Sequence, residues 1–135
     1  MKTTHIAFAV AALCLSAAAG AQTVMKISYS TSITSHYGVG STAFCDEVEK
    51  GTQGRYKCQQ FPNAALGGER EMIEAVQLGT QDVANVSTGA LGNFVPEVKI
   101  VDIPFLVRDY AHARKVMDGE VGQDLLKKIT AKGLV

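Results

Sequence analysis

The segment 66–88, LGGEREMIEAVQLGTQDVANVST, constrains the fold most, because it carries the signals of a helix followed directly by a strand. Glu69 and Glu71 fall in the first turn of the expected helix, where the helix dipole favours carboxylates. The apolar residues that recur at helical spacing are Met72, Ile73 and Val76. Gly79 then marks the expected end, since glycine enters the left-handed conformation without a steric penalty.

The second half of this segment predicts a strand and a ligand-binding loop. Residues 82–86 are typical of a buried strand, and Ser87, Thr88 and Gly89 follow it as a polar loop. In an open α/β sheet, ligands bind at the carboxyl ends of the strands. We therefore expect Ser87 and Thr88 to contact a small polar molecule.

The other elements follow from periodicity and from turn residues. The predicted strands are 25–30, 55–61 and 82–86, and the predicted helix between the first two is 38–50. The order strand, helix, strand, helix, strand is typical of a parallel α/β sheet. Beyond this unit we expect an irregular segment at 89–96 and helices at 109–117 and 120–132.

Residues 1–21 have the features of a secretory signal peptide. Lys2 supplies the positive start, residues 6–15 are apolar, and the small residues 19–21 form a cleavage site. Leu13 precedes Cys14 where a lipoprotein signal requires a small residue, so we expect cleavage after Ala21 and a soluble exported product.

Cys45 and Cys58 remain in the expected mature chain. In an oxidising compartment an even pair of cysteines favours a disulfide, which here would join the first helix to the second strand. Closing a loop of this size contributes roughly 3 kcal/mol. Two buried free thiols are the alternative.

Charge and motifs argue against several other functions. The 13 basic and 13 acidic residues give a net charge of zero and no basic face for nucleic acid. Residues 38–43 match the letters of a dinucleotide-binding pattern. We do not assign that function, because a loop separates the motif from the preceding strand. His36 and His112 lie at no metal-ligand spacing, and no nucleophile signature is present. We therefore expect a binding protein without a metal, a cofactor or a reaction.

Three segments resemble one family in order and at matching spacing: FPNAALGGEREMIEAVQLGTQDV, VPEVKIVDIPFLVRDYAHA and GQDLLKKITAKG. They are similar to the solute-binding subunits of tripartite ATP-independent periplasmic (TRAP) transporters, the four-carbon-dicarboxylate-binding-protein family. The resemblance covers 24–135. It implies a monomeric two-lobe α/β clamshell that binds one organic acid in the periplasm and delivers it to a membrane permease pair.

The resemblance also implies site residues. Ser30 and Ser87 match the family's pocket positions after the first and third strands, His36 and Tyr37 lie in the loop after the first strand, and Thr88 follows Ser87. Some sialic-acid-binding members carry Asn and Glu where this chain has the two serines. The family's carboxylate-pairing arginine lies beyond residue 135. Packing in the core is the expected role of Phe105, with lining of the cleft as the alternative.

The main hypothesis is therefore that residues 22–135 form the N-terminal lobe of a periplasmic protein that binds a dicarboxylate, a sugar acid or a similar carboxylate. Leu134 and Val135 resemble the start of another strand, so we expect the chain to be a fragment of a longer protein. The alternatives are a complete small exported binding or scaffold module unrelated to transport, and a small exported enzyme.

Overall fold

The computed structural model describes residues 22–134. The predicted signal peptide and its cleavage site after Ala21 therefore lie outside the described residues. Among residues 22–134, no helix is both long and apolar enough to cross a lipid bilayer.

A three-stranded parallel sheet organises the first part of the chain. Its strands are β1 (Thr23–Tyr29), β2 (Tyr56–Phe61) and β3 (Val83–Asn85). β1 is central and pairs in parallel with β2 on one side and β3 on the other, in the order β2-β1-β3. The predicted parallel α/β arrangement is confirmed. β3 is shorter than the predicted strand, and its residues are half-buried rather than buried.

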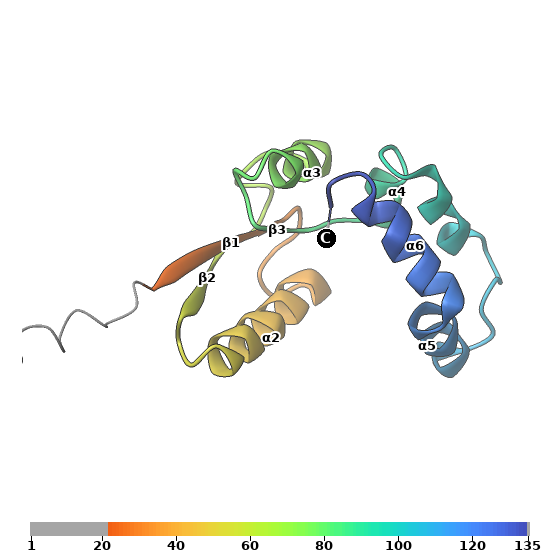
Figure 1. The fold of residues 1–135 in the computed structure, drawn as a ribbon, viewed down its shortest axis with the longest axis horizontal. Helices are drawn as coiled ribbons and strands as arrows, with labels where there is room; N and C mark the ends of the chain where they lie inside the picture. Colours follow the sequence, from red (N-terminus) through yellow and green to blue (C-terminus); the bar gives the residue numbers. More distant parts are fainter. Residues whose placement is uncertain (1–21, 135) are drawn as a thin grey trace, which may run out of the picture.

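Two helices lie on opposite sides of the sheet (Figure 1). α2 (His36–Gly51) connects β1 to β2, and α3 (Glu69–Gln77) connects β2 to β3. α3 ends as the sequence predicts: Gly79 has a φ of 70°, and its amide donates to the carbonyl of Val76. The amide of Thr80 donates to the carbonyl of Ala75, which completes a Schellman motif.

The start of α2 differs from the prediction. The helix begins at His36 and not at Gly38, because the Ser35 hydroxyl caps it by accepting a hydrogen bond from the Gly38 amide at 3.3 Å. His36 and Tyr37 therefore lie in the first helical turn and not in a loop. The predicted disulfide joins Cys45 of α2 to Cys58 of β2, with the two Cα atoms 5.6 Å apart.

The core of this part lies between the sheet and its helices. The largest fully buried side chains include Tyr29, Met72 and Ile73. The Tyr29 hydroxyl donates to Gln60 Oε1 at 2.7 Å, so this buried polar atom has a partner. Burial raises the pKa of Tyr29, which keeps its hydroxyl protonated as a donor.

The second part of the chain is helical and follows β3 (Figure 1). Its elements are α4 (Thr88–Leu91), the 3₁₀ helix η2 (Pro96–Asp102), α5 (Tyr110–Asp118) and α6 (Glu120–Thr130). The helices predicted at 109–117 and 120–132 correspond to α5 and α6. The segment predicted to be irregular, 89–96, instead contains most of α4, because Ser87 caps that helix.

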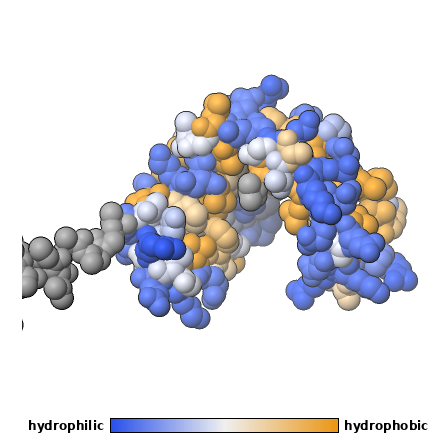
Figure 2. Space-filling model, in the orientation of Figure 1, coloured by the Kyte–Doolittle hydropathy of each residue, from blue (hydrophilic) through white to orange (hydrophobic). Residues whose placement is uncertain are grey.

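The segment between η2 and α5 exposes apolar side chains. Phe105 is 99% exposed and has a φ of 62°, so its expected packing in the core is wrong for the described residues. Tyr110 is 91% exposed at the start of α5. Figure 2 shows apolar surface at the right-hand edge of the molecule, over the region between α4 and α5.

Candidate functional site

The candidate site lies where β1 and β3 end. The chain leaves the central strand β1 for β2 on one side and later returns to β3 on the other side. The connections after β1 and β3 therefore run in opposite directions from neighbouring carboxyl ends. In open α/β sheets, this switch point is where ligands bind. Ser30 directly follows β1, and Ser87 lies two residues after β3. Both side chains are half-buried.

The carboxylate of Glu69 joins these two serines. The Ser30 hydroxyl donates to Glu69 Oε1 at 2.9 Å, and the Ser87 hydroxyl donates to Glu69 Oε2 at 2.6 Å. The Ser87 backbone amide donates to the same Oε2 at 3.2 Å. Glu69 is the first residue of α3, so its carboxylate also lies at the positive end of the helix dipole. One side chain therefore holds the loops after β1 and β3 together.

These hydrogen bonds keep Glu69 ionised. Burial of the half-buried carboxylate would by itself raise its pKa, since burial disfavours charge. The hydrogen bonds from the Ser87 hydroxyl, the Ser30 hydroxyl and the Ser87 amide stabilise the charged form and outweigh burial. The net result is a pKa of Glu69 below its ordinary value. The site therefore presents a negative charge at neutral pH.

Ser87 has a second role that the sequence-based loop prediction missed. Its hydroxyl oxygen accepts a hydrogen bond from the Ala90 amide at 3.2 Å and so caps α4. Ser87, Thr88 and Gly89 thus form a helix cap and the first helical turn, and the loop prediction is wrong. The Thr88 hydroxyl donates to Asp102 Oδ1 at the end of η2. Thr88 therefore points to a different carboxylate from the one that Ser30 and Ser87 share.

His36 and Tyr37 lie together at the start of α2. Their rings pack edge to face with centroids 4.5 Å apart, the His36 side chain is exposed and Tyr37 is half-buried. Asn85, the last residue of β3, donates to the Tyr37 carbonyl at 3.4 Å and to the Ser41 hydroxyl at 3.3 Å. These two long hydrogen bonds connect the end of β3 to the first two turns of α2.

Sequence reasoning missed Glu69 and Asn85 as parts of this region. The sequence does place Glu69 at the start of a helix, directly after Gly67 and Gly68. Its carboxylate was explained there by the helix dipole alone, without a role in the site. Its contacts with Ser30 and Ser87 depend on the packing of α3 against the ends of two other segments. Arg70, the next residue, pairs with Glu74 at 3.0 Å on the exposed face of α3.

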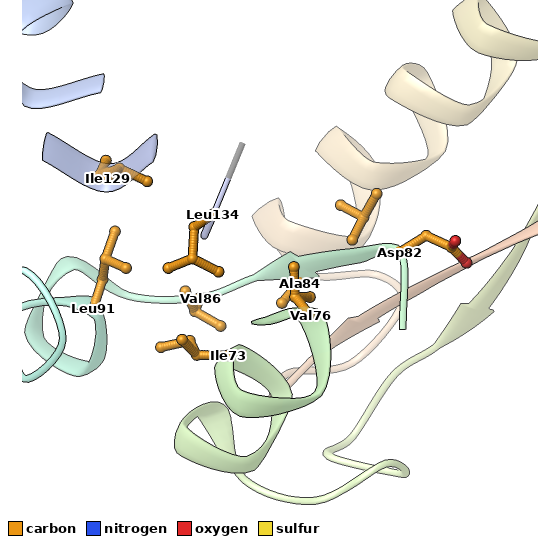
Figure 3. A pocket seen from close by; sticks show the side chains of 9 residues that line it. Ile73, Val76, Asp82, Ala84, Val86, Leu91, Ile129 and Leu134 are labelled. Carbon is orange, nitrogen blue, oxygen red and sulfur yellow. The ribbon is translucent and has the colours of Figure 1, made fainter. Parts of the chain in front are cut away.

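A separate cavity of about 170 Å³ lies between α3, β3 and the C-terminal residues (Figure 3). Its lining is apolar apart from Asp82, and includes Ile73, Val86, Ile129 and Leu134. The Asp82 carboxylate accepts a hydrogen bond from the Lys26 amide at 2.8 Å and points away from the apolar side chains (Figure 3). None of the five predicted ligand-binding residues lines this cavity, and an apolar space gives no partner to a carboxylate.

Metal binding has no support among residues 22–134. No group of three or more His, Cys, Asp or Glu side chains in this range could hold a metal ion. The chemistry that the site offers is hydrogen bonding by hydroxyls and a carboxylate, with an imidazole and a phenol at the start of α2.

Residues 27–135 match the family described as bacterial extracellular solute-binding protein, family 7. A solute-binding protein of Verminephrobacter eiseniae is 58% identical over 117 residues, which are 87% of this chain and 35% of that protein. This chain therefore spans about a third of the length of such a relative.

Two solved structures have the same fold over this range. A TRAP periplasmic solute-binding protein from Polaromonas sp. JS666, bound to D-erythronate, is 75% identical with a TM-score of 0.77, over 82% of this chain and 37% of that one. A TRAP periplasmic solute-binding protein from Sulfurospirillum deleyianum, with bound succinate, is 36% identical with a TM-score of 0.74, over 83% of this chain and 36% of that one.

Proposed function

Because this chain belongs to the bacterial extracellular solute-binding proteins of family 7, we propose that it forms one lobe of a protein that captures a small organic acid. Its relatives of known structure are TRAP periplasmic solute-binding proteins that bind carboxylates and sugar acids. The observation that carries the proposal for this chain is the Ser30–Glu69–Ser87 cluster at the switch point of the sheet.

Residues 22–135 make up the N-terminal lobe in this proposal, after removal of a signal peptide at Ala21. The proposal is supported by the match from residue 27 onward and by the chain's coverage of about a third of its relatives. The rest of the clamshell supplies the cationic group for the acid, since an arginine fork suits a carboxylate. The lobes close on the acid because the closed form makes more contacts with it.

Ser30, Ser87 and Thr88 contact the solute in this proposal, together with His36 and Tyr37. The support is their position: the serines flank the switch point, and the two ring side chains begin the helix that follows β1. The protein works as a periplasmic monomer that passes the acid to a TRAP-type membrane permease and carries out no reaction.

The test is ligand-induced thermal stabilisation of the complete gene product that contains this chain. The panel holds dicarboxylates, sugar acids, keto acids and amino acids, with neutral sugars of similar size as controls. At a ligand concentration one hundred times the dissociation constant, binding adds about 2.7 kcal/mol to the free energy of unfolding. Stabilisation by one class of acid supports the proposal, and no stabilisation by any acid contradicts it.

A pair of serine variants tests the site. Ser30→Ala removes a hydroxyl at the switch point and should weaken binding of the acid. Ser32→Ala removes an exposed hydroxyl only two residues away, which lies 3.1 Å from the Thr34 hydroxyl, and should leave the affinity unchanged. Equal affinities for the two variants would contradict the assignment of Ser30.

A further inference from the structure

Glu69 accepts hydrogen bonds from both serine hydroxyls at the switch point, and this fixes what kind of ligand group the serines can receive. We propose that Glu69 is a positioning residue that makes this lobe bind the hydroxyl groups of a polyhydroxy acid and reject a second carboxylate. The inference rests on the proposed function and narrows its substrate class.

The first step is the hydrogen-bonding capacity of each serine. A serine hydroxyl has one proton to donate and two lone pairs that accept. The protons of Ser30 and Ser87 both go to Glu69, at 2.9 and 2.6 Å. One lone pair of Ser87 accepts from the Ala90 amide. What remains for a ligand is therefore acceptor capacity, with two lone pairs on Ser30 and one on Ser87.

Thr88 follows the same pattern independently. Its hydroxyl proton goes to the carboxylate of Asp102. The serine and threonine hydroxyls of the predicted site (Ser30, Ser87 and Thr88) thus all direct their protons at carboxylates of the protein. A ligand group that binds them has to bring its own proton.

The second step compares ligand groups at this position. An alcohol hydroxyl can donate to the free lone pairs of Ser30 and Ser87. An ionised carboxylate has acceptors only, so it would face hydroxyl oxygens whose protons are already used. A ligand carboxylate would also lie beside the ionised Glu69 carboxylate, and the repulsion between these two negative charges disfavours its binding.

The third step is access and charge. Ser30, Glu69 and Ser87 are half-buried, so a solute reaches the hydroxyls while water screens the Glu69 charge only in part. Hydrogen bonds hold the pKa of Glu69 below its ordinary value, so the carboxylate stays ionised across the neutral range. The two serine hydroxyls therefore keep donating to Glu69 across this pH range.

The experiment measures the dissociation constants of four-carbon acids by isothermal titration calorimetry on the complete gene product. D-Erythronate carries three hydroxyls and one carboxylate, butanoate carries no hydroxyl, and succinate carries two carboxylates. We expect D-erythronate to bind at least about tenfold more tightly than butanoate and succinate, since two or more hydrogen bonds distinguish it from them.

Glu69→Gln tests the role of the carboxylate. A glutamine amide accepts from one serine and donates to the other, which frees one serine proton for a ligand carboxylate. The ratio of succinate to D-erythronate dissociation constants should then fall by about tenfold. Glu71→Gln is the matched control, because it removes the same charge from the same helical turn, and its ratio should equal that of the wild type.

The outcomes separate the two proposals. If no acid binds, the proposed function fails. If acids bind but succinate or butanoate binds as tightly as D-erythronate, the inference about hydroxyl selection fails and the proposed function stands. A Glu69→Gln ratio equal to that of the wild type also overturns the inference. If that variant does not fold, Ser30→Ala replaces it, and it should weaken D-erythronate binding more than succinate binding.

Discussion

The hydroxyl of Ser87 lies 2.6 Å from the carboxylate of Glu69, although 18 residues separate them in the sequence. This contact ties the start of α3 to the cap of α4, and Ser30 extends it to the end of β1. It joins three segments at one point, so its loss should affect stability as well as ligand selection.

The first prediction concerns the pH dependence of stability. The pKa of Glu69 is lower in the folded protein than in the unfolded chain, so the unfolded chain binds more protons in the range between the two values. The stabilising contribution is present above the unfolded pKa and is lost as the pH falls through the folded pKa. Glu69→Gln should cost about 1–2 kcal/mol at pH 7 and less in acid.

Urea unfolding of the wild type and of Glu69→Gln at several pH values measures this contribution. Glu71→Gln serves as the control, because its carboxylate belongs to the same turn and makes none of the contacts with Ser30 or Ser87. A constant stability difference between the wild type and Glu69→Gln from neutral to acid pH would contradict the prediction.

The second prediction concerns the bond between Cys45 and Cys58. It closes a loop with a sequence separation of 13 and fixes α2 on the edge strand β2. The double substitution of both cysteines to alanine should lower the free energy of unfolding by about 3 kcal/mol, mainly because the unfolded chain gains freedom. Urea unfolding with and without a reducing agent measures it. Reductant should destabilise the wild type and leave the double variant unchanged.

The third prediction concerns the cap of α5. Asp109 Oδ1 accepts a hydrogen bond from the His112 amide at 2.7 Å and so caps α5, a helix with no buried residue. Asp109→Ala should destabilise the protein by about 1 kcal/mol, while Asp109→Asn should be nearly neutral because asparagine caps as well. Thermal unfolding of the two variants compares them, and equal losses would show that the charge and not the cap matters.

Local patterns were enough to predict the order of the elements. The parallel sheet, the end of α3 at Gly79 and the Cys45–Cys58 bond all depend on residues close in sequence or on a single pair. The predicted loop at Ser87 was wrong because the polar composition of Ser-Thr-Gly suits a helix cap as well as a loop.

The site could be predicted only in part. Ser30 and Ser87 meet at Glu69, but Thr88 turns to Asp102, and no spacing rule connects a residue of α3 with the ends of β1 and β3. Phe105 was expected in the core because of its apolar side chain, yet a left-handed backbone in a loop directs it to the exterior. Such contacts depend on the packing of distant segments, which periodicity does not record.

The last prediction uses two glycines of α2 that look alike in the sequence. A Cβ atom on Gly38 would lie 2.0 Å from the carbonyl oxygen of Ile33, because the loop after β1 passes directly against the first helical turn. A Cβ atom on Gly40 would meet nothing within 4 Å. The first glycine is therefore required by contact with the backbone, and the second only lowers the helix propensity.

Gly38→Ala should destabilise the protein by about 2 kcal/mol or more, since backbone has to move to relieve the overlap. Gly40→Ala should stabilise it by about 0.5–1 kcal/mol, because alanine loses less conformational entropy in a helix. Urea unfolding of both variants measures the difference, whose sign should be opposite for the two. Since Ile33 lies in the loop between Ser30 and His36, Gly38→Ala should also weaken acid binding, whereas Gly40→Ala should preserve it. Equal effects of the two substitutions would mean that the close contact between Gly38 and the Ile33 backbone does not determine stability.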